Sequence, residues 1–246
     1  MTADVLILFA VALAAGMLAF YIPNVSKGFY KLALVFAGAY LFSITIIHVL
    51  PELFHDAVNP GLLGIFTLGG FFLQQGLEFA SQGVEHGHIH VHDHAHRHRE
   101  SSAVLVVAAL SLHSLLEGGM LNQSAMTDGN SSQTLLLGIL IHKAPEAFAL
   151  MSVLVCELEK KRRAFLYLMV FAMATPAGIL LGNYLTINAW LSSESYMLLV
   201  ALVSGNFLHI STTIVFESSA DHTFNARKMG VAMGAAALAV IAEILM

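Results

Sequence analysis

The sequence predicts an all-α polytopic membrane protein that crosses the bilayer eight times. Hydrophobic residues make up 57% of the 246 positions and charged residues 11%, against about 25% charged residues in soluble domains. Long apolar runs alternate with brief polar loops, and the basic residues gather in every second loop. These three observations indicate repeated membrane crossings rather than a soluble core.

Eight runs reach the length of about 20 apolar residues that one helical crossing needs. The predicted spans are residues 3–22, 29–50, 61–82, 103–123, 133–155, 164–185, 195–216 and 228–246. We expect a single transmembrane domain over residues 1–246, with one His-rich loop at residues 83–102.

The first three spans are recognised by their apolar length. The first resembles a signal peptide at Ala12-Leu-Ala14, but no basic residue precedes it and the apolar run continues to Ile22. Because that run is longer than a signal core, we expect it to be retained as a helix. A short polar loop separates the second span from the third, and the His-rich loop follows the third.

The fourth and fifth spans carry ionisable residues in their apolar interiors. His113 and Glu117 lie four residues apart in the fourth span, and His142 and Glu146 repeat this spacing in the fifth. Residues i and i+4 share one face of an α-helix. Because lipid does not solvate such groups, ionisable residues at this depth mark an ion or substrate path.

The last three spans complete the predicted bundle. The sixth is apolar around an interior proline, Pro176, and the seventh carries His209 and Glu217 toward its end. The eighth is short, rich in Ala and Gly, and contains Glu243.

The basic residues predict which side of the membrane each loop faces. Apart from Lys143, which lies inside the fifth span, every Lys and Arg falls at a loop that follows an odd-numbered span. These residues are Lys27, Lys31, Arg97, Arg99, Lys160, Lys161, Arg162, Arg163, Arg227 and Lys228. Cytoplasmic loops are enriched in Lys and Arg, so we expect these loops in the cytoplasm and both chain ends outside.

A low-complexity tract lies in the loop between the third and fourth spans. Histidine occupies every second position of it, at His86, His88, His90, His92, His94, His96 and His98. Neutral imidazole is a good ligand for Zn²⁺, Cu²⁺ and Ni²⁺. We therefore expect a disordered cytoplasmic linker that binds metal weakly at several exchanging sites.

The two His–Glu pairs are expected to meet in space. A short loop joins the fourth and fifth spans, so these spans run antiparallel, and His113 then lies level with Glu146 while Glu117 lies level with His142. Two nitrogen and two oxygen ligands suit Zn²⁺, and Fe²⁺, Mn²⁺, Co²⁺ or Cd²⁺ also fit. The alternative is that these side chains bond one another only to stabilise the bundle.

Two neighbours of the fifth-span pair bear on this hypothesis. Pro145 removes one helical hydrogen bond and frees the carbonyl of Ile141, which must then be buried in protein or face a water-filled cavity. Lys143 follows His142 directly. Because a buried ammonium needs a partner, we expect it to pair with Glu117 or Glu146.

These motifs resemble those of the ZIP (Zrt/Irt-like) family of metal importers. His113-Ser-Leu-Leu-Glu117-Gly118 and His142-Lys-Ala-Pro-Glu146 are similar to the paired signatures of the family's fourth and fifth helices. Its second, third and sixth helices have stretches similar to His48-Val-Leu-Pro51-Glu52, Gly70-Phe-Phe-Leu73 and Thr175-Pro176-Ala-Gly178.

The resemblance implies a three-plus-two-plus-three helix arrangement, inward transport of Zn²⁺ and related ions, and pairing into homodimers. It also implies that His113, Glu117, His142 and Glu146 form the transport site at the bilayer midplane. Gly38-Ala-Tyr-Leu in the second span and Gly205-Asn-Phe-Leu in the seventh add a faint internal match, of the kind that accompanies inverted repeats in transporters.

The sequence departs from family members that hold two metals. Those members use an Asn or an acid after each histidine and an acid from the sixth helix, whereas this chain has Ser114 and Lys143 at these positions and no acid in the sixth span. We expect a single metal in the membrane site, with the Lys143 ammonium repelling a second one.

Four further residues are candidates for the ion path. His48 and Glu52 lie near the outer end of the second span, and His209 and Glu217 near the cytoplasmic end of the seventh. A mouth lined with carboxylates and imidazoles attracts cations. The alternative is that these residues are solvated or packing residues.

Two other functions are compatible with membrane His and Glu ligands. A membrane metalloenzyme of the hydrolase type is one, although His-Glu-x-x-His proteases place the glutamate directly after the first histidine, where this chain has Ser114. A zinc exporter of the diffusion-facilitator type is the other. It would have fewer spans and a polar C-terminal domain, whereas we expect this chain to end within its eighth span.

We therefore expect an integral protein of the plasma or inner membrane that carries divalent metal ions, zinc above all, into the cytoplasm. No catalytic residue and no cofactor besides the transported metal is expected. The expected partners are divalent metal ions, membrane lipid and a second copy of the chain, and nucleic acid is not among them.

Overall fold

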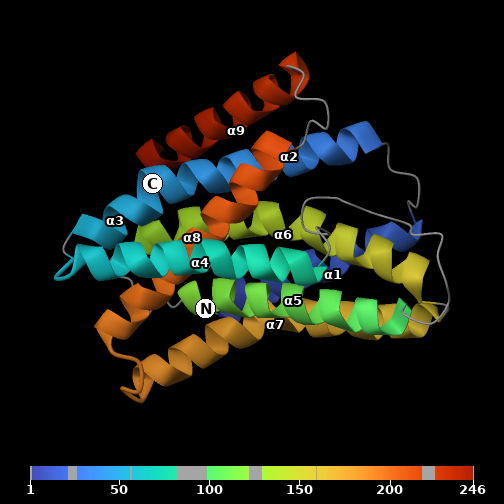
Figure 1. The fold of residues 1–246 in the computed structure, drawn as a ribbon, viewed down its shortest axis with the longest axis horizontal. Coiled ribbons are helices and arrows are strands. Elements are labelled where there is room, and N and C mark those ends of the chain that lie inside the picture. Colours follow the sequence, from blue (N-terminus) through green and yellow to red (C-terminus); the bar gives the residue numbers. More distant parts are fainter. Residues whose placement is uncertain are drawn as a thin grey trace.

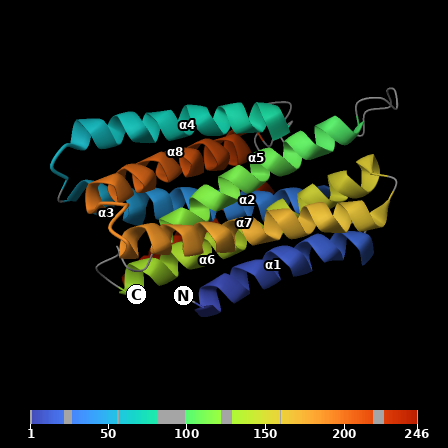
Figure 2. The ribbon, with the colours of Figure 1, turned by 90° about the horizontal axis from the view of Figure 1, so that it is seen from below.

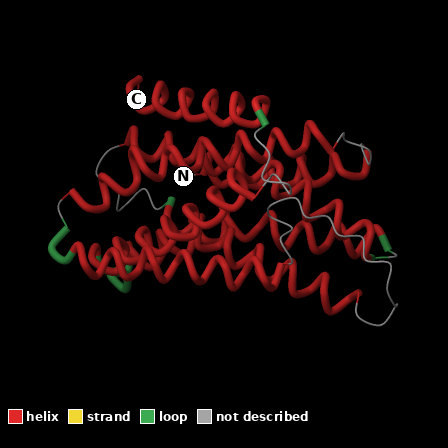
Figure 3. Tube along the Cα trace, turned by 45° about the horizontal axis from the view of Figure 1, so that its top comes forward, coloured by secondary structure: helices red, strands yellow, loops and turns green. Residues whose placement is uncertain are grey.

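The computed structural model describes residues 2–21, 27–55, 57–81, 99–121, 129–158, 160–217 and 225–245. Within these ranges every regular element is a helix and no strand occurs (Figure 3). The elements are α1 (Thr2–Tyr21), α2 (Lys27–Ile44), the π-helical turn η1 (Thr45–Val49), α3 (Leu50–His55), α4 (Pro60–Ser81), α5 (Arg99–Met120), α6 (Gly129–Glu157), α7 (Lys161–Ile187), α8 (Ser193–Glu217) and α9 (Ala226–Leu245).

Eight helical stretches in the described residues are long and apolar enough to cross a membrane. They follow the eight predicted spans in order, which confirms the all-α class and the number of spans. Most boundaries agree with the prediction to within a few residues. The second stretch is the exception, because it runs without a break from Gly28 to His55, so its predicted end at residue 50 is too early.

The second stretch continues because its helix widens where a proline would otherwise end it. Pro51 has no N–H, and its ring crowds the carbonyl of Ile47 four residues back. In the structure the N–H of Leu50 bonds the carbonyl of Thr45, five residues back, at the end of the π-helical turn. This wider turn lets α2 run on into α3, and it carries His48. Single π turns within α-helices are frequent at functional sites.

Helices distant in the sequence lie side by side in the bundle. α4 packs along α8, α5 along α7, and α1 along α6 (Figures 1 and 2). α9 lies at the edge of the bundle against α2 (Figure 1). Both chain ends lie toward the end of the bundle that also holds α3 and the α7–α8 connection (Figure 2).

Glycines set the two closest helix crossings. A methyl group at Gly70 of α4 would overlap the carbonyl oxygen of Leu202 on α8, and one at Gly178 of α7 would overlap the carbonyl oxygen of Leu115 on α5. Small residues let membrane helices approach until their backbones touch. At the first crossing the side-chain amide of Asn206 on α8 faces the Gly70 carbonyl, and with its nitrogen and oxygen exchanged it donates a 2.6 Å hydrogen bond to that carbonyl.

The buried apolar side chains form two clusters, one toward each end of the bundle. On α5, Leu110 belongs to one cluster and Met120 to the other. On α6 the order is reversed, because Ile139 belongs to the second cluster and Leu150 to the first. The polar segments of α5 and α6 lie between these clusters, so apolar packing separates them from both ends of the bundle.

Candidate metal centre

The α5 pair is completely buried. His113 and Glu117 are each 0% exposed, and Nε2 of His113 lies 2.9 Å from Oε1 of Glu117. Two ligands of one tetrahedral Zn²⁺ lie about 3.3 Å apart, because each metal–ligand bond is about 2.0 Å long. The helical i, i+4 spacing therefore already brings these two atoms close to the separation that a shared metal needs.

The ligand-bearing turns of α5 and α6 lie at the same depth. α5 and α6 follow each other in the chain and run antiparallel. The ammonium of Lys143 on α6 lies 2.8 Å from the hydroxyl of Ser114 on α5. The histidines that directly precede these two residues therefore lie at the same depth in the bundle.

Three of the four predicted ligands come together. His113, Glu117 and His142 each offer a ligand atom, and these atoms all lie within 4.8 Å of one another. The rings of His113 and His142 are perpendicular, with their centroids 6.0 Å apart. This geometry leaves two nitrogens and one oxygen facing a common point.

Glu146, the fourth predicted ligand, lies beside this group rather than within it. Its Oε2 accepts a 2.7 Å hydrogen bond from Lys143. Its Oε1 is buried and has no hydrogen-bond partner among the described residues. One oxygen of Glu146 is thus held by the ammonium, and the other remains available to a metal or a water molecule.

Lys143 joins the two carboxylates. Its ammonium lies 2.6 Å from Oε2 of Glu117 and 2.7 Å from Oε2 of Glu146, and it donates a 2.8 Å hydrogen bond to Ser114. The ring of Phe171 lies 5.0 Å from the ammonium, within the range of a cation–π interaction. The predicted pairing of Lys143 is confirmed, and it involves both glutamates.

Pro145 lies inside the continuous helix α6. The carbonyl of Pro145 itself accepts a hydrogen bond from the hydroxyl of Tyr30 on α2, at 3.3 Å. This contact ties the ligand-bearing turn of α6 to a neighbouring helix.

The centre combines imidazole and carboxylate donors in a site sealed from solvent. Among the four predicted ligands, Glu146 is 1% exposed and the other three are 0% exposed. Lys143 beside them is also 1% exposed. With neutral imidazoles, two carboxylates and one ammonium leave a net charge of about −1, and burying such charges is costly without compensation. A divalent cation at the common point would supply that compensation.

The structure places His48 and Glu52 at the end of the bundle that carries α3. Nε2 of His48 lies 3.4 Å from Oε2 of Glu52, and its Nδ1 lies 2.9 Å from Oε1 of Glu243 on α9. Nothing in the sequence pattern joins Glu243 to this pair. Its only signal was an acid inside the apolar eighth span, which is costly without a partner.

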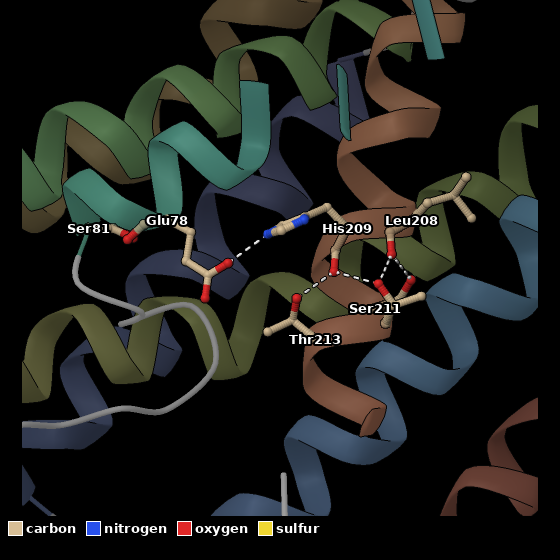
Figure 4. Close-up of polar contacts among 7 residues, drawn as sticks. Glu78, Ser81, Leu208, His209, Ser211 and Thr213 are labelled. Carbon is tan, nitrogen blue, oxygen red and sulfur yellow. Dashed lines mark hydrogen bonds and ion pairs between the residues drawn. The ribbon is translucent and has the colours of Figure 1, made fainter. Parts of the chain in front are cut away.

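The structure places His209 between α8 and α4. Its Nε2 lies 2.6 Å from Oε2 of Glu78 (Figure 4), and its ring meets Phe71 edge-on at 4.8 Å. Glu78 of α4 therefore contacts α8 through this histidine. Glu217 is the last residue of α8, but its side chain is outside the described part of the chain, and so are residues 86–98 with the histidine tract.

The chain is similar to known metal transporters. Residues 78–242 match the model of a family described as ZIP zinc transporters. Over 152 residues the chain is 31% identical to Zinc transporter ZIP9-B of Xenopus laevis, covering 59% of this chain and 50% of that protein. Over 147 residues it is 27% identical to Protein zntD of Dictyostelium discoideum, covering 57% of this chain and 21% of that protein. The alignments thus span half or less of these relatives, while the family match contains all four predicted ligands.

Proposed function

The chain belongs to the ZIP zinc transporter family, and from that premise we propose that it carries divalent metal ions across a membrane. The observation that supports this most directly is the buried group of His113, Glu117 and His142, whose ligand atoms lie within 4.8 Å of one another. Ionisable side chains at such depth mark an ion path.

Zinc is the proposed substrate. Two imidazole nitrogens with one or two carboxylate oxygens form a donor set that Zn²⁺ accepts in tetrahedral geometry. The printed name of the Xenopus relative is also that of a zinc transporter. Fe²⁺, Mn²⁺, Co²⁺ and Cd²⁺ accept similar donors, so we propose them as weaker substrates.

Glu146 is proposed as the fourth ligand. Its free Oε1 reaches the metal when the side chain turns, while its Oε2 keeps the contact with Lys143 that the structure shows. The three-plus-two-plus-three helix arrangement is proposed to hold these four ligands at the bilayer midplane, within a single domain over residues 1–246.

Transport is proposed to run toward the cytoplasm. The two apolar clusters that flank the centre would act as seals that open in turn, so that the metal never meets an open channel. The tract from His86 to His98 would then take up metal as it leaves. We also propose that the protein resides in the plasma or inner membrane as a homodimer.

Metal uptake into proteoliposomes tests the proposal. We expect purified protein to carry Zn²⁺ to an internal zinc-sensitive dye, and we expect His113→Ala, Glu117→Gln and His142→Ala each to slow uptake at least tenfold. His55→Ala is the matched control, because this exposed histidine of α3 lies outside the centre. Equal folding of all variants is checked by size-exclusion chromatography.

Retention of near-normal uptake by two of the three variants would show that the path lies elsewhere. Zinc leaving preloaded cells, but never entering them, would instead identify an exporter. Zinc bound tightly without any flux would favour a metalloenzyme.

A further inference from the structure

We propose that His48 of η1 and Glu52 of α3 form a second metal site, and that Glu243 of α9 orients its histidine. The sequence pattern supports this, because His48-Val-Leu-Pro51-Glu52 repeats the His-x-x-Pro-Glu pattern of His142-Lys-Ala-Pro145-Glu146. The cluster lies outside the residues matched by the family model.

The hydrogen bond to Glu243 assigns the protons of His48. A carboxylate only accepts hydrogen bonds, so the 2.9 Å contact between Nδ1 and Oε1 of Glu243 requires a proton on Nδ1. In a neutral imidazole, Nε2 then carries a lone pair. A metal-binding histidine almost always donates its other N–H to a carboxylate in this way, which fixes the ring for its metal.

The other ring nitrogen faces a second acceptor. Nε2 of His48 lies 3.4 Å from Oε2 of Glu52, close to the separation of about 3.3 Å between two ligands of one tetrahedral Zn²⁺. Two acceptors at this distance favour a shared cation between them. The α5 pair, His113 and Glu117, has the same i, i+4 spacing with its atoms 2.9 Å apart.

The exposure of the cluster suits reversible capture. The side chain of His48 is 13% exposed, that of Glu52 43% and that of Glu243 33%. Water would complete the coordination of a metal held by only two protein ligands, so binding is weaker than in a closed site. A nitrogen ligand selects Zn²⁺, Co²⁺ or Cd²⁺ over Mg²⁺ or Ca²⁺.

A buried hydroxyl lies between this cluster and the centre. Tyr40 on α2 is 0% exposed, and its hydroxyl has no hydrogen-bond partner among the described residues. The ring of Tyr40 borders Gly138 of α6, one turn before His142. The Tyr40 hydroxyl is thus a polar group between the His48–Glu52 cluster and the membrane centre.

We expect metal bound by this cluster to pass on to the membrane centre, and this expectation rests on the proposed function. Metal binding by the cluster does not depend on it. Binding is therefore measured in full-length His142→Ala protein, whose membrane centre lacks one ligand. His48→Ala or Glu52→Gln is then combined with His142→Ala. We expect equilibrium dialysis with Zn²⁺ to show about one fewer bound ion in each double variant than in the His142→Ala protein. The histidine tract is present in all of them, so only the differences count.

Glu194→Gln is the matched control, because it removes an exposed carboxylate from the start of α8 at the same end of the bundle. Glu243→Gln, which keeps the shape of the side chain, should weaken Zn²⁺ binding about tenfold. In transport-competent protein, His48→Ala should raise the half-saturating Zn²⁺ concentration about tenfold, with a much smaller effect on the maximal rate. Excess Mg²⁺ should not compete.

Thermal melting separates a metal site from a purely structural contact between η1 and α9. Zn²⁺ should raise the melting temperature of the His142→Ala protein more than that of the same protein carrying Glu52→Gln. The site would be overturned if His48→Ala bound as much zinc as the His142→Ala protein, or if Glu194→Gln lost as much bound zinc as His48→Ala. It would also be overturned if zinc raised the melting temperature of both proteins equally. An absence of flux in unmodified protein, with this binding intact, would instead refute the proposed function alone.

Discussion

Lys143 is the residue that most distinguishes the candidate centre from a plain cluster of four ligands. Its ammonium contacts one oxygen of Glu117 and one of Glu146, so two buried carboxylates share a single internal cation. Removing one partner from a buried ionic group costs about 3–5 kcal/mol, because the remaining charge is left uncompensated. The ammonium therefore compensates both carboxylates in the structure, and we expect it to repel a second cation.

Replacing this ammonium should make the fold depend on metal. In Lys143→Met we expect the melting temperature without metal to fall, and Zn²⁺ to restore most of the loss, because a cation that binds only the native state stabilises it. Lys143→Asp should bind one more Zn²⁺ than the unmodified protein, as measured by inductively coupled plasma mass spectrometry.

Lys161→Met is the control for Lys143→Met, since Lys161 is exposed at the start of α7. A zinc effect of the same size in both methionine variants would contradict the role given to Lys143. Two metals found between α5 and α6 in an anomalous-scattering map of the unmodified protein would contradict the single-metal site.

At the scale of helices, glycine positions decide which pairs touch. α4 approaches α8 closely at Gly70, and Gly69, the neighbouring residue, has nothing within 4 Å of an added methyl group. The same residue type therefore has opposite consequences at adjacent positions of one helix. The crossing of α5 and α7 at Gly178 follows the same rule and fixes the position of the helix that carries His113 and Glu117.

These adjacent glycines offer a matched pair of variants. We expect Gly70→Ala to destabilise the protein by about 1–3 kcal/mol, because its methyl group must push the backbone of α8 away. Gly69→Ala should be neutral or slightly stabilising, because alanine loses less conformational freedom than glycine in a helix. Thermal melting of the two purified variants measures the difference, and equal melting temperatures would contradict the close crossing.

At the scale of the whole molecule, charge and packing divide the two ends of the bundle. The end that holds the α6–α7 connection carries Lys160 and Arg163, and the end with α3 carries the carboxylates of Glu52 and Glu243. Cytoplasmic surfaces of membrane proteins are enriched in basic residues. The orientation with both chain ends outside remains a prediction that follows from this division.

Cysteine labelling tests the orientation. Cys156 is the one cysteine of the sequence, so Cys156→Ser gives a clean background. In it, Val58→Cys, at a residue 88% exposed, should react with a membrane-impermeant maleimide in intact cells. Lys160→Cys should react only after the membrane is permeabilised. The reverse pattern would invert the topology and the proposed direction of transport.

The sequence by itself determined the features that are local along the chain. Apolar runs of about 20 residues specify helices that cross a bilayer, and the i, i+4 spacing places His113 beside Glu117 whatever surrounds them. The antiparallel order of α5 and α6 also predicted that His142 would join this pair. One local rule failed at Pro51, where the helix widened into a π turn and continued to His55.

Only the tertiary structure decided which groups meet across helices. It brought Lys143 of α6 against Glu117 of α5, gave His48 its partner Glu243 on α9, and joined His209 to Glu78. Such contacts depend on how close two helices approach and how each is rotated about its axis. Backbone contacts at glycines and the interlocking of buried side chains fix both quantities, and these involve residues far apart in the sequence, so no spacing within one segment reveals them.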